Sequence, residues 1–545
     1  MRRTITAMIL VAILLAGAVP ARSYTLQFTD ASSAVQIKWP SNVVTIALSS
    51  SLASPAANIK AGSDVTGAAR RALLQWAGAS DIRFVETSST TQSISPSTGG
   101  DGVSLITIAN TPENAALFSG SDRPGRTRVF FDPATGLISE ADIALNPSAQ
   151  FSTDGTFGTY DLESVLTHEL GHLLGLEHSG MVGATMQPRL ALNGLYTLPA
   201  FSPRTLSEDD RAGVRSLYGP RTGLGAIAGT VSYSSGAPAY GAHVWAQDSA
   251  TGRSIAGSIT SQTGAYRIED LPPGQYRLVC EHLDGNVVAS EIASSGGAYA
   301  GLANPQATFP ATEVADQVTV TSANAASLNI TLSGGQPFLN PRLLGINGQL
   351  STIAVPLEPG RTYTVYVGGN GLDQLTGAGI SIASPYISVE SSSLKLQPLG
   401  TTYPIISFDI RVSEDVPVGE YDIRFRSNNG EVSYIAGGLT VDDWAGALFA
   451  SGAEAAGESA SAGMSANELA LVPTNEATAA GATTTDYPRG ESLAASNSHL
   501  RARRSAAYGR ASRFDNLKAV AAERFKGLLE RLSNPSGLGL RPGPS

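Results

Sequence analysis

Hydrophobic and polar positions follow two different periods over residues 24–219. Apolar residues recur at helical spacing from Val65 to Trp76 and from Leu162 to Leu174, which predicts two amphipathic helices. The second should begin near Asp161, whose side chain can cap it, and a third should begin at Ser207. β-Branched and aromatic runs predict strands over residues 43–48, 82–85, 103–108, 129–131 and 141–145. The pattern therefore predicts a mixed α+β domain.

Near residue 225 the pattern changes to short strands separated by Gly and Pro turns. These strands predict two all-β sandwich modules, at 224–335 and 336–441. Residues 442–500 are rich in Ala, Ser, Gly and Thr and predict a disordered, low-complexity linker, because they offer little apolar surface to offset ordering entropy. Residues 501–545 are basic and place apolar residues on one helical face, which predicts an amphipathic helix with weak attachment to anionic membranes or other surfaces.

The first 21 residues have the pattern of a targeting segment. Arg2 and Arg3 precede an apolar run over residues 5–19, and Val19-Pro20-Ala21 offers small residues for cleavage. Because the run is short for a bilayer span, we predict a secretory signal peptide at 1–21, with an uncleaved N-terminal anchor as the alternative. The predicted location is secreted, extracellular or in the cell envelope.

The composition agrees with an exported protein and makes nucleic acid an unfavourable partner. Charged residues make up only 15% of the chain and Gly is frequent, as in extracellular β-rich modules. The formal net charge of −10 argues against nucleic acid as a partner. Cys280 is the one cysteine, so no intramolecular disulfide can form, which is typical of bacterial secretion. We expect Cys280 to be a buried apolar filler.

The residues that carry chemistry lie in the stretch from His168 to His178. His168 and His172 are four residues apart, so on a helix both imidazoles project from one face and can share a metal ion. Glu169 follows the first histidine and lies beside the metal without being needed as a ligand. Gly175 suits the sharp turn that ends the helix and brings His178 round as a third nitrogen ligand.

Three imidazoles with one open coordination position suit a single catalytic Zn²⁺. Zinc lowers the pKa of bound water to about 7, and Glu169 can accept the proton and later pass it to a leaving amine. The motif therefore predicts a zinc-dependent endopeptidase with Glu169 as its catalytic residue. A zinc-binding domain that has lost turnover is the alternative, because a motif does not prove turnover.

Over these residues the chain resembles the metzincin metallopeptidases, and within them the matrixin family. Ser179 follows the third histidine, while Met186 and Pro188 match the Met-turn of matrixins in spacing and type. The likeness covers a domain at 22–221 and is specific over 161–219, where the ends of the family's last helix also match. It implies a five-stranded sheet, a long active-site helix and a substrate bound antiparallel to an edge strand, for which we expect residues 141–145.

The resemblance also implies roles for the residues after the third histidine. Met186 would form a hydrophobic floor under the metal, although a lone Met is usually core packing. Gln187, Pro188 and Arg189 would line the wall of the pocket beside the metal. Asp209 and Asp210 match the family's last helix, with ordinary helix-start acids as the equal alternative.

Three features depart from matrix metalloproteinases. No histidine precedes His168, so their second, structural zinc site is absent in its usual form. No cysteine precedes the domain, and a propeptide of ordinary size has no room before the first strands. Calcium is common in the family, but its candidate acids do not form a recognisable calcium loop. These acids are Asp101, Asp132, Asp142 and Asp154, and the remaining histidines, His243, His282 and His499, are not expected to bind metal.

The downstream modules offer no cluster of catalytic groups. Residues 224–335 are similar to carboxypeptidase regulatory-like domains through segments such as Leu271-Pro272-Pro273-Gly274-Gln275-Tyr276, and 336–441 resemble a bacterial immunoglobulin-like module. We expect spacers, stalks or adhesive modules. The main hypothesis is a secreted endopeptidase acting on extracellular proteins or peptides, and the alternative is an envelope adhesion or scaffolding protein with a secondary or inactive peptidase domain.

Overall fold

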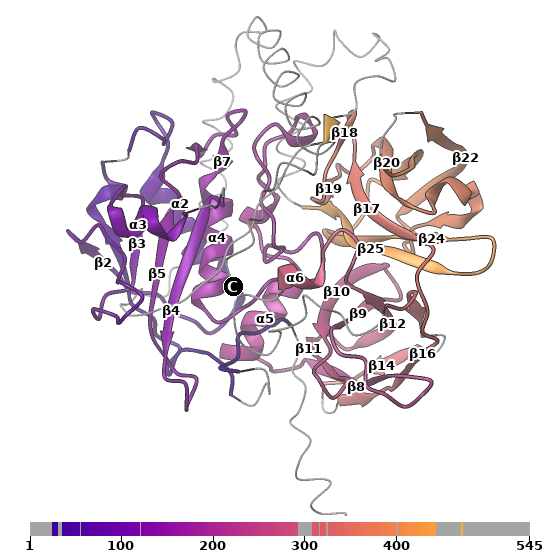
Figure 1. Cartoon of the computed structure of the whole chain (residues 1–545), viewed down its shortest axis with the longest axis horizontal. Helices are drawn as coiled ribbons and strands as arrows, with labels where there is room; N and C mark the ends of the chain where they lie inside the picture. Colours follow the sequence, from indigo (N-terminus) through magenta and orange to yellow (C-terminus); the bar gives the residue numbers. More distant parts are fainter. Residues whose placement is uncertain are drawn as a thin grey trace, which may run out of the picture.

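The structure is a computed structural model of the whole chain (Figure 1). It describes residues 24–30, 35–54, 56–119, 121, 123–292, 308–314, 317–322, 325–398 and 402–442, with the backbone of β26 (Ala470–Leu471). The predicted signal peptide at 1–21 lies outside the described residues, as do the linker at 442–500, save Asp442 and β26, and the basic tail at 501–545. Among the described residues, no helix is long and apolar enough to cross a membrane.

The N-terminal part of the described chain is built on a five-stranded mixed sheet in the order β2-β1-β3-β5-β4. Strands β2, β1, β3 and β5 run parallel, and β4 pairs antiparallel with β5. The bounds are β1 (Ile46–Ser49), β2 (Glu86–Ser89), β3 (Leu105–Thr107), β4 (Gly125–Phe131) and β5 (Ile138–Leu145), followed by the short pair β6 (Phe151–Ser152) and β7 (Tyr160–Asp161).

The predicted helices form where the apolar spacing and capping residues place them. Helix α2 (Val65–Ala79) begins after Asp64, which accepts a hydrogen bond from the Gly67 amide. Helix α5 (Glu208–Tyr218) begins after Ser207 in a capping box with Asp210, as predicted. Trp76 of α2 is fully buried and donates its indole N–H to the Thr167 carbonyl in the next helix, α4 (Leu162–Leu173), at 2.8 Å. A further short helix, α3 (Pro112–Leu117), follows β3.

The expectation that residues 141–145 form the edge strand is wrong. They belong to β5, which lies inside the sheet between β3 and β4. The alternation that indicated an edge depends on Asp142, yet Asp142 is buried and accepts hydrogen bonds from the amides of Ser95 and Leu105 at 2.7 and 2.9 Å. Local backbone partners let this acid lie inside the sheet. The edge on this side is β4.

After α5 the chain is rich in β-strands, and the two predicted modules share one sheet. In this sheet β10 pairs with β24, and the order β13-β12-β9-β10-β24-β25-β19 runs from one module into the other. The first has β8 (Gly225–Tyr233), β9 (Ala242–Asp248), β10 (Arg253–Ile259), β11 (Ala265–Leu271), β12 (Gly274–His282), α6 (Ala289–Ile292), β13 (Thr312–Glu313), β14 (Val318–Val320), β15 (Ala325–Ser327) and β16 (Ile330–Leu332). The second has β17 (Asn340–Gly345), β18 (Gln349–Leu350), β19 (Val355–Pro356), β20 (Thr362–Asn370), β21 (Ile380–Ser381), β22 (Ile387–Gln397), β23 (Ile405–Val412), β24 (Gly419–Arg426) and β25 (Val432–Val441).

Both β modules pack directly on the N-terminal domain, the first against α5 and the second against the loop that contains Tyr196 (Figure 1). The Asp209 carboxylate of α5 accepts a hydrogen bond from the Gly257 amide of β10 at 2.7 Å. The Val182 amide donates to the Ala436 carbonyl of β25 at 2.9 Å. The modules therefore form part of the surroundings of the histidine motif, which differs from the expectation of separate spacers. Cys280 of β12 is buried and unpaired, as expected.

Candidate metal centre

Helix α4 presents His168 and His172 on one face because its start and its apolar face are both fixed. Asp161 caps the helix, accepting hydrogen bonds from the amide and hydroxyl of Ser164 at 2.9 Å. The same carboxylate forms a buried ion pair with Arg204, whose Nε lies 2.8 Å from it. Every residue of α4 is buried, so the histidines are held on a rigid element.

The helix ends at the glycine that the sequence singled out. Gly175 has a φ of 97°, and a Cβ atom at this position would lie 2.4 Å from the Ile37 carbonyl oxygen. Only glycine suits both this backbone angle and this close approach. The Leu176 amide then returns to the Gly171 carbonyl at 3.0 Å, and the chain turns to carry His178 back toward the helix.

The three histidines converge as the motif predicts. Their ligand atoms lie within 4.8 Å of one another, and their ring centroids are 4.9 to 5.5 Å apart. Each Nδ1 lies against a backbone carbonyl: Thr185 at 2.8 Å for His168, Leu176 at 2.9 Å for His172 and Glu291 at 2.6 Å for His178. Hydrogen bonds of this kind fix the ring orientation and leave Nε2 to bind a metal.

The charge state of the cluster also fits a zinc ligand set. Burial lowers the pKa of His172 to about 3 and lowers the pKa values of His168 and His178, with repulsion between the rings adding to the effect for His172 and His178. The rings are therefore neutral imidazoles, the form that binds metal. The Nε2 atoms of His172 and His178 are buried without a hydrogen-bond partner among the described residues. Buried polar atoms of this kind are costly unless a ligand satisfies them, so the residues fit Zn²⁺.

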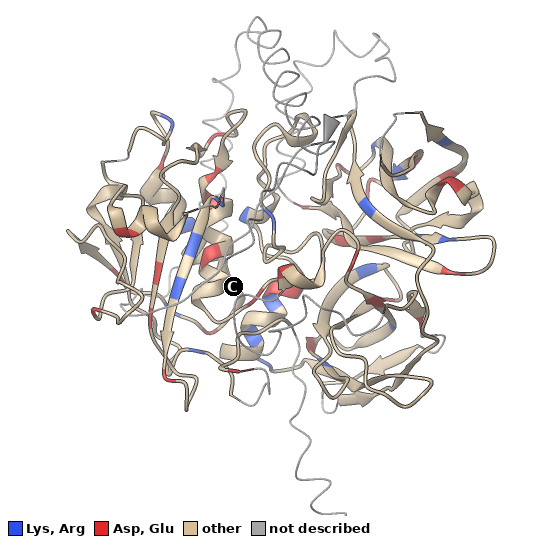
Figure 2. Cartoon of the chain, viewed as in Figure 1, with Lys and Arg blue, Asp and Glu red and all other residues tan. Residues whose placement is uncertain are grey.

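Glu169 lies beside this cluster and is held by β4. The Thr127 hydroxyl donates to Glu169 Oε2 at 2.6 Å, while Oε1 is buried and has no partner in the described part of the chain. Burial raises the pKa of Glu169 to about 7, against the opposing effects of the Thr127 hydrogen bond, Arg123 and Arg126. Figure 2 shows the basic residues along β4, next to α4. A carboxyl group with a pKa near neutrality and one free oxygen is suited to proton transfer.

Met186 packs against the helix that bears the first two histidines. Its sulfur lies close to Gly171, where a Cβ atom would be only 2.2 Å away. Asp210 accepts hydrogen bonds from the amides of Thr185 and Met186 at 2.7 and 3.0 Å, so this carboxylate fixes the turn as well as capping α5. Asp209 accepts from the Ser179 hydroxyl at 2.7 Å. Both acids therefore do more than begin a helix.

The residues predicted to form the pocket wall contact both β modules. Gln187 donates to the Thr352 carbonyl at 3.2 Å, and Pro188 is buried. Arg189 Nη1 donates to the Asn286 carbonyl at 2.5 Å, and its guanidinium forms an ion pair with Glu291. A cavity between this loop and the second β module is lined by Gln187, Arg189 and several apolar residues, among them Tyr196 and Ile353.

The other candidate ligands do not come together. No second trio of His, Cys, Asp or Glu side chains is comparably close within the described ranges. Asp101 and Asp132 accept local turn hydrogen bonds, Asp142 is buried inside the sheet, and Asp154 pairs with Lys60. His243 stacks on Trp245, His282 lies 3.6 Å from Asp284, and His499 falls outside the described residues.

Several residues that build the site were not found from the sequence. Thr127 and Glu291 lie 42 and 113 residues from the side chains they contact, so no local spacing indicates them. Gly125 approaches the Glu169 side chain so closely that a Cβ atom would lie 2.8 Å from it. Gly171 was inside the motif, and a glycine within a helix is itself a signal of close packing.

A buried helix with two histidines four residues apart, a third histidine after a glycine turn and a Met-turn beneath them defines the metzincin class of zinc peptidase domain. Within that class, residues 38–219 match the family model described as Matrixin, and residues 226–333 match that of the carboxypeptidase regulatory-like domain. Residues 38–219 are therefore similar to the matrixin domains of zinc metalloendopeptidases.

Two curated relatives show the extent of the similarity. Metalloendoproteinase 1-MMP of Arabidopsis thaliana is 33% identical over 166 residues, which is 30% of this chain and 40% of that protein. Interstitial collagenase of Oryctolagus cuniculus is 27% identical over 157 residues, which is 29% of each chain. The matched region thus spans less than half the length of these relatives. Among solved structures, the major pilin subunit BcpA of Bacillus cereus matches with 13% identity and a TM-score of 0.13, over 39% of this chain and 66% of that one.

Proposed function

We propose that this protein is a secreted zinc-dependent endopeptidase that hydrolyses peptide bonds of extracellular proteins. The observation that supports it most is the convergence of His168, His172 and His178 beside a glutamate with a free, buried carboxylate oxygen. Three neutral imidazoles leave one open position on zinc, as in catalytic rather than structural sites.

Each residue has a role in this proposal. When bound, zinc would act as a Lewis acid that activates water and polarises a carbonyl group. Glu169 Oε1 accepts a proton from the attacking water and returns it to the leaving amine, while Thr127 holds Oε2. Gly175 turns the chain to place His178, and Met186 and Pro188 support the floor and wall. The free edge of β4 binds the extended substrate by backbone hydrogen bonds, antiparallel to the strand.

The remaining parts of the chain complete the proposal. The peptidase domain covers 22–221, the carboxypeptidase regulatory-like module 224–335 and an immunoglobulin-like module 336–441. A signal peptide exports the protein, and its substrates are proteins or peptides. The alternative of an envelope adhesion or scaffolding protein rests on the β modules and not on the histidine cluster.

Metal removal tests this function. Full-length protein is incubated with denatured casein or gelatin, with and without a zinc chelator. We expect cleavage to fall to background with the chelator and to return on adding zinc, because zinc is required for the hydrolysis. Magnesium added to the chelated sample is the control and should not restore cleavage. Cleavage that persists in zinc-free protein would contradict the proposal.

A further inference from the structure

The candidate metal centre is closed to solvent. His168, His172 and His178 are each 1% exposed, and Glu169 is 0% exposed. A protein substrate must bring its carbonyl group to the open position on the metal, and such sites are normally open clefts. The described structure therefore holds the site in a closed form, so cleavage of a protein substrate by the wild-type chain has to come from a minor open fraction.

A segment of the first β module contacts this buried site. The segment Asp284–Ile292 leaves β12 and forms α6, which lies beside α4 and α5 (Figure 1). The Glu291 carbonyl accepts a hydrogen bond from His178 Nδ1 at 2.6 Å, and the Glu291 carboxylate pairs with Arg189. Arg189 also donates to the Asn286 carbonyl at 2.5 Å. One segment thus contacts a metal-binding histidine and the pocket wall together.

We propose that Asp284–Ile292 is an intramolecular plug that keeps the peptidase site closed, and that activation requires its displacement. The inference rests on the proposed function, because it concerns regulation of the same site. It places a latency device downstream of the catalytic domain.

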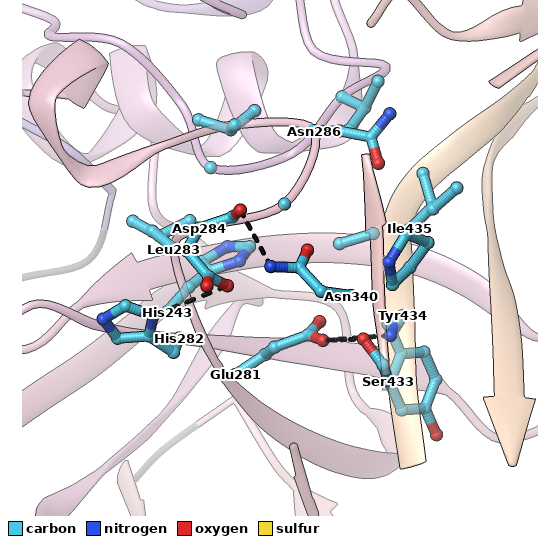
Figure 3. Close-up of a pocket in the computed structure, with 16 residues that line it drawn as sticks. His243, Glu281, His282, Leu283, Asp284, Asn286, Asn340, Ser433, Tyr434 and Ile435 are labelled. Atoms are coloured by element: carbon cyan, nitrogen blue, oxygen red, sulfur yellow. Dashed lines mark hydrogen bonds and ion pairs between the residues drawn. The ribbon is translucent and has the colours of Figure 1, made fainter. Parts of the chain in front are cut away.

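The plug is held firmly at its base. The base residues 283–285 line a small pocket between the two β modules and the 180–182 loop, together with Asn340, Ser433 and Tyr434 (Figure 3). Asn340 donates to the Asp284 carbonyl at 3.2 Å, and Glu281 of β12 accepts from the Tyr434 amide at 3.1 Å. The base therefore stays with the modules when the tip moves.

The tip buries Ala289 and Ile292 but also carries local costs. Helix α6 has only four residues, which is too short to be stable on its own. Both polar atoms of the Asn286 side chain are buried with no hydrogen-bond partner among the described residues. Unsatisfied buried polar atoms raise the free energy of the closed state. The Arg189–Glu291 ion pair, with each side chain 13% exposed, is the main polar contact that offsets it. A segment with these properties can open without unfolding the modules.

The contact with His178 admits a second interpretation that predicts the opposite result. A carbonyl that orients a metal-binding histidine normally strengthens metal binding. If the segment served only this purpose, weakening it would reduce metal affinity and would not improve access. Access of a probe and metal affinity therefore have to be measured on the same variants.

The test uses full-length protein loaded with Co²⁺, whose visible spectrum reports a new ligand, and a tripeptide hydroxamate as the probe. Two variants open the plug: Glu291→Ala, which keeps the carbonyl near His178, and replacement of residues 286–292 by a Gly/Ser linker of equal length. Ser290→Ala is the matched control, because Ser290 is exposed on the same helix. Metal content is measured for each variant.

We expect the probe to bind at least about 10-fold more tightly to both opened variants than to wild type and Ser290→Ala, since apparent affinity scales with the open fraction. The rate of casein cleavage should rise together with the affinity for the probe. Equal probe binding by wild type and the opened variants, or loss of metal from Glu291→Ala, would overturn the inference. Opened variants that bind the probe but do not cleave would refute the proposed function and leave the plug standing.

Discussion

Replacing Glu169 by Gln is expected to abolish proteolysis while one zinc per chain is retained. The amide keeps the shape of the side chain and its contact with Thr127, but it cannot accept a proton at the free oxygen. General acid–base catalysis contributes about 10² to 10⁴ in rate, so the loss should have that size. The measurement is the rate of casein cleavage together with the zinc content of the purified variant.

Glu86→Gln is the control for this change. Glu86 lies on β2, at the far edge of the sheet, and pairs with Arg70 on the surface. The activity of Glu86→Gln should equal that of the wild-type protein. Cleavage by Glu169→Gln at the wild-type rate would remove Glu169 from the mechanism, and loss of zinc would show a structural role instead.

The largest effect on stability is expected from Arg204→Met. Arg204 is 2% exposed and pairs with Asp161, which caps α4, and lies 3.9 Å from Glu163. Methionine fills similar space but leaves the buried Asp161 carboxylate without its cation, while Glu163 keeps its ion pair with Arg71. Breaking a buried pair in this way costs about 3–5 kcal/mol, measured as the free energy of unfolding in urea.

Arg70→Met provides the comparison for this substitution. The Arg70–Glu86 pair has a half-exposed arginine, 50% accessible, and pairs of this kind contribute at most about 1 kcal/mol. We expect zinc affinity to fall only for Arg204→Met, because Asp161 fixes the start of the helix that carries His168 and His172. Equal destabilisation by the two variants would show that the buried pair does not hold α4.

The parts of the site that could be predicted from the sequence are those set by local rules. Helical spacing and a capping residue at Asp161 place His168, Glu169 and His172 on α4, and the positive φ of Gly175 fits the predicted turn. These features depend on residues within one or two turns of each other, so the local pattern contains the information needed.

Contacts between distant segments could not be predicted in the same way. Thr127 reaches Glu169 from a strand, and its position follows from which strand lies at the edge of the sheet. The edge was assigned to the wrong strand because Asp142 looked like a solvent-facing position. The shared sheet formed by β10 and β24 likewise depends on packing between modules, and neither strand shows it alone.

Strand ends illustrate the same limit. The predicted strand at 82–85 does pair with the chain before β1, since the amides of Val44 and Ile46 donate to the carbonyls of Arg83 and Val85. The regular ladder of β2, however, begins at Glu86 and continues through polar residues that a hydrophobic pattern does not mark. Backbone pairing with β1, rather than side-chain burial, extends this strand.

The β modules acquire a function through their position. They contact α5, the loop after His178 and the pocket wall, and the first module supplies the segment that contacts His178 and that we propose as a plug. Access to the site is therefore coupled to the arrangement of the modules. The immunoglobulin-like assignment of 336–441 stays a prediction.

The most direct test of the zinc site is the X-ray absorption spectrum at the zinc edge of full-length protein loaded with one equivalent of Zn²⁺. The account predicts three imidazole nitrogens at about 2.0–2.1 Å from the metal, with the imidazole contribution reduced in His172→Ala, which removes one of the three ligands. Zinc that is not retained after dialysis, or a ligand shell unchanged in His172→Ala, would contradict the metal centre on which the proposed peptidase depends.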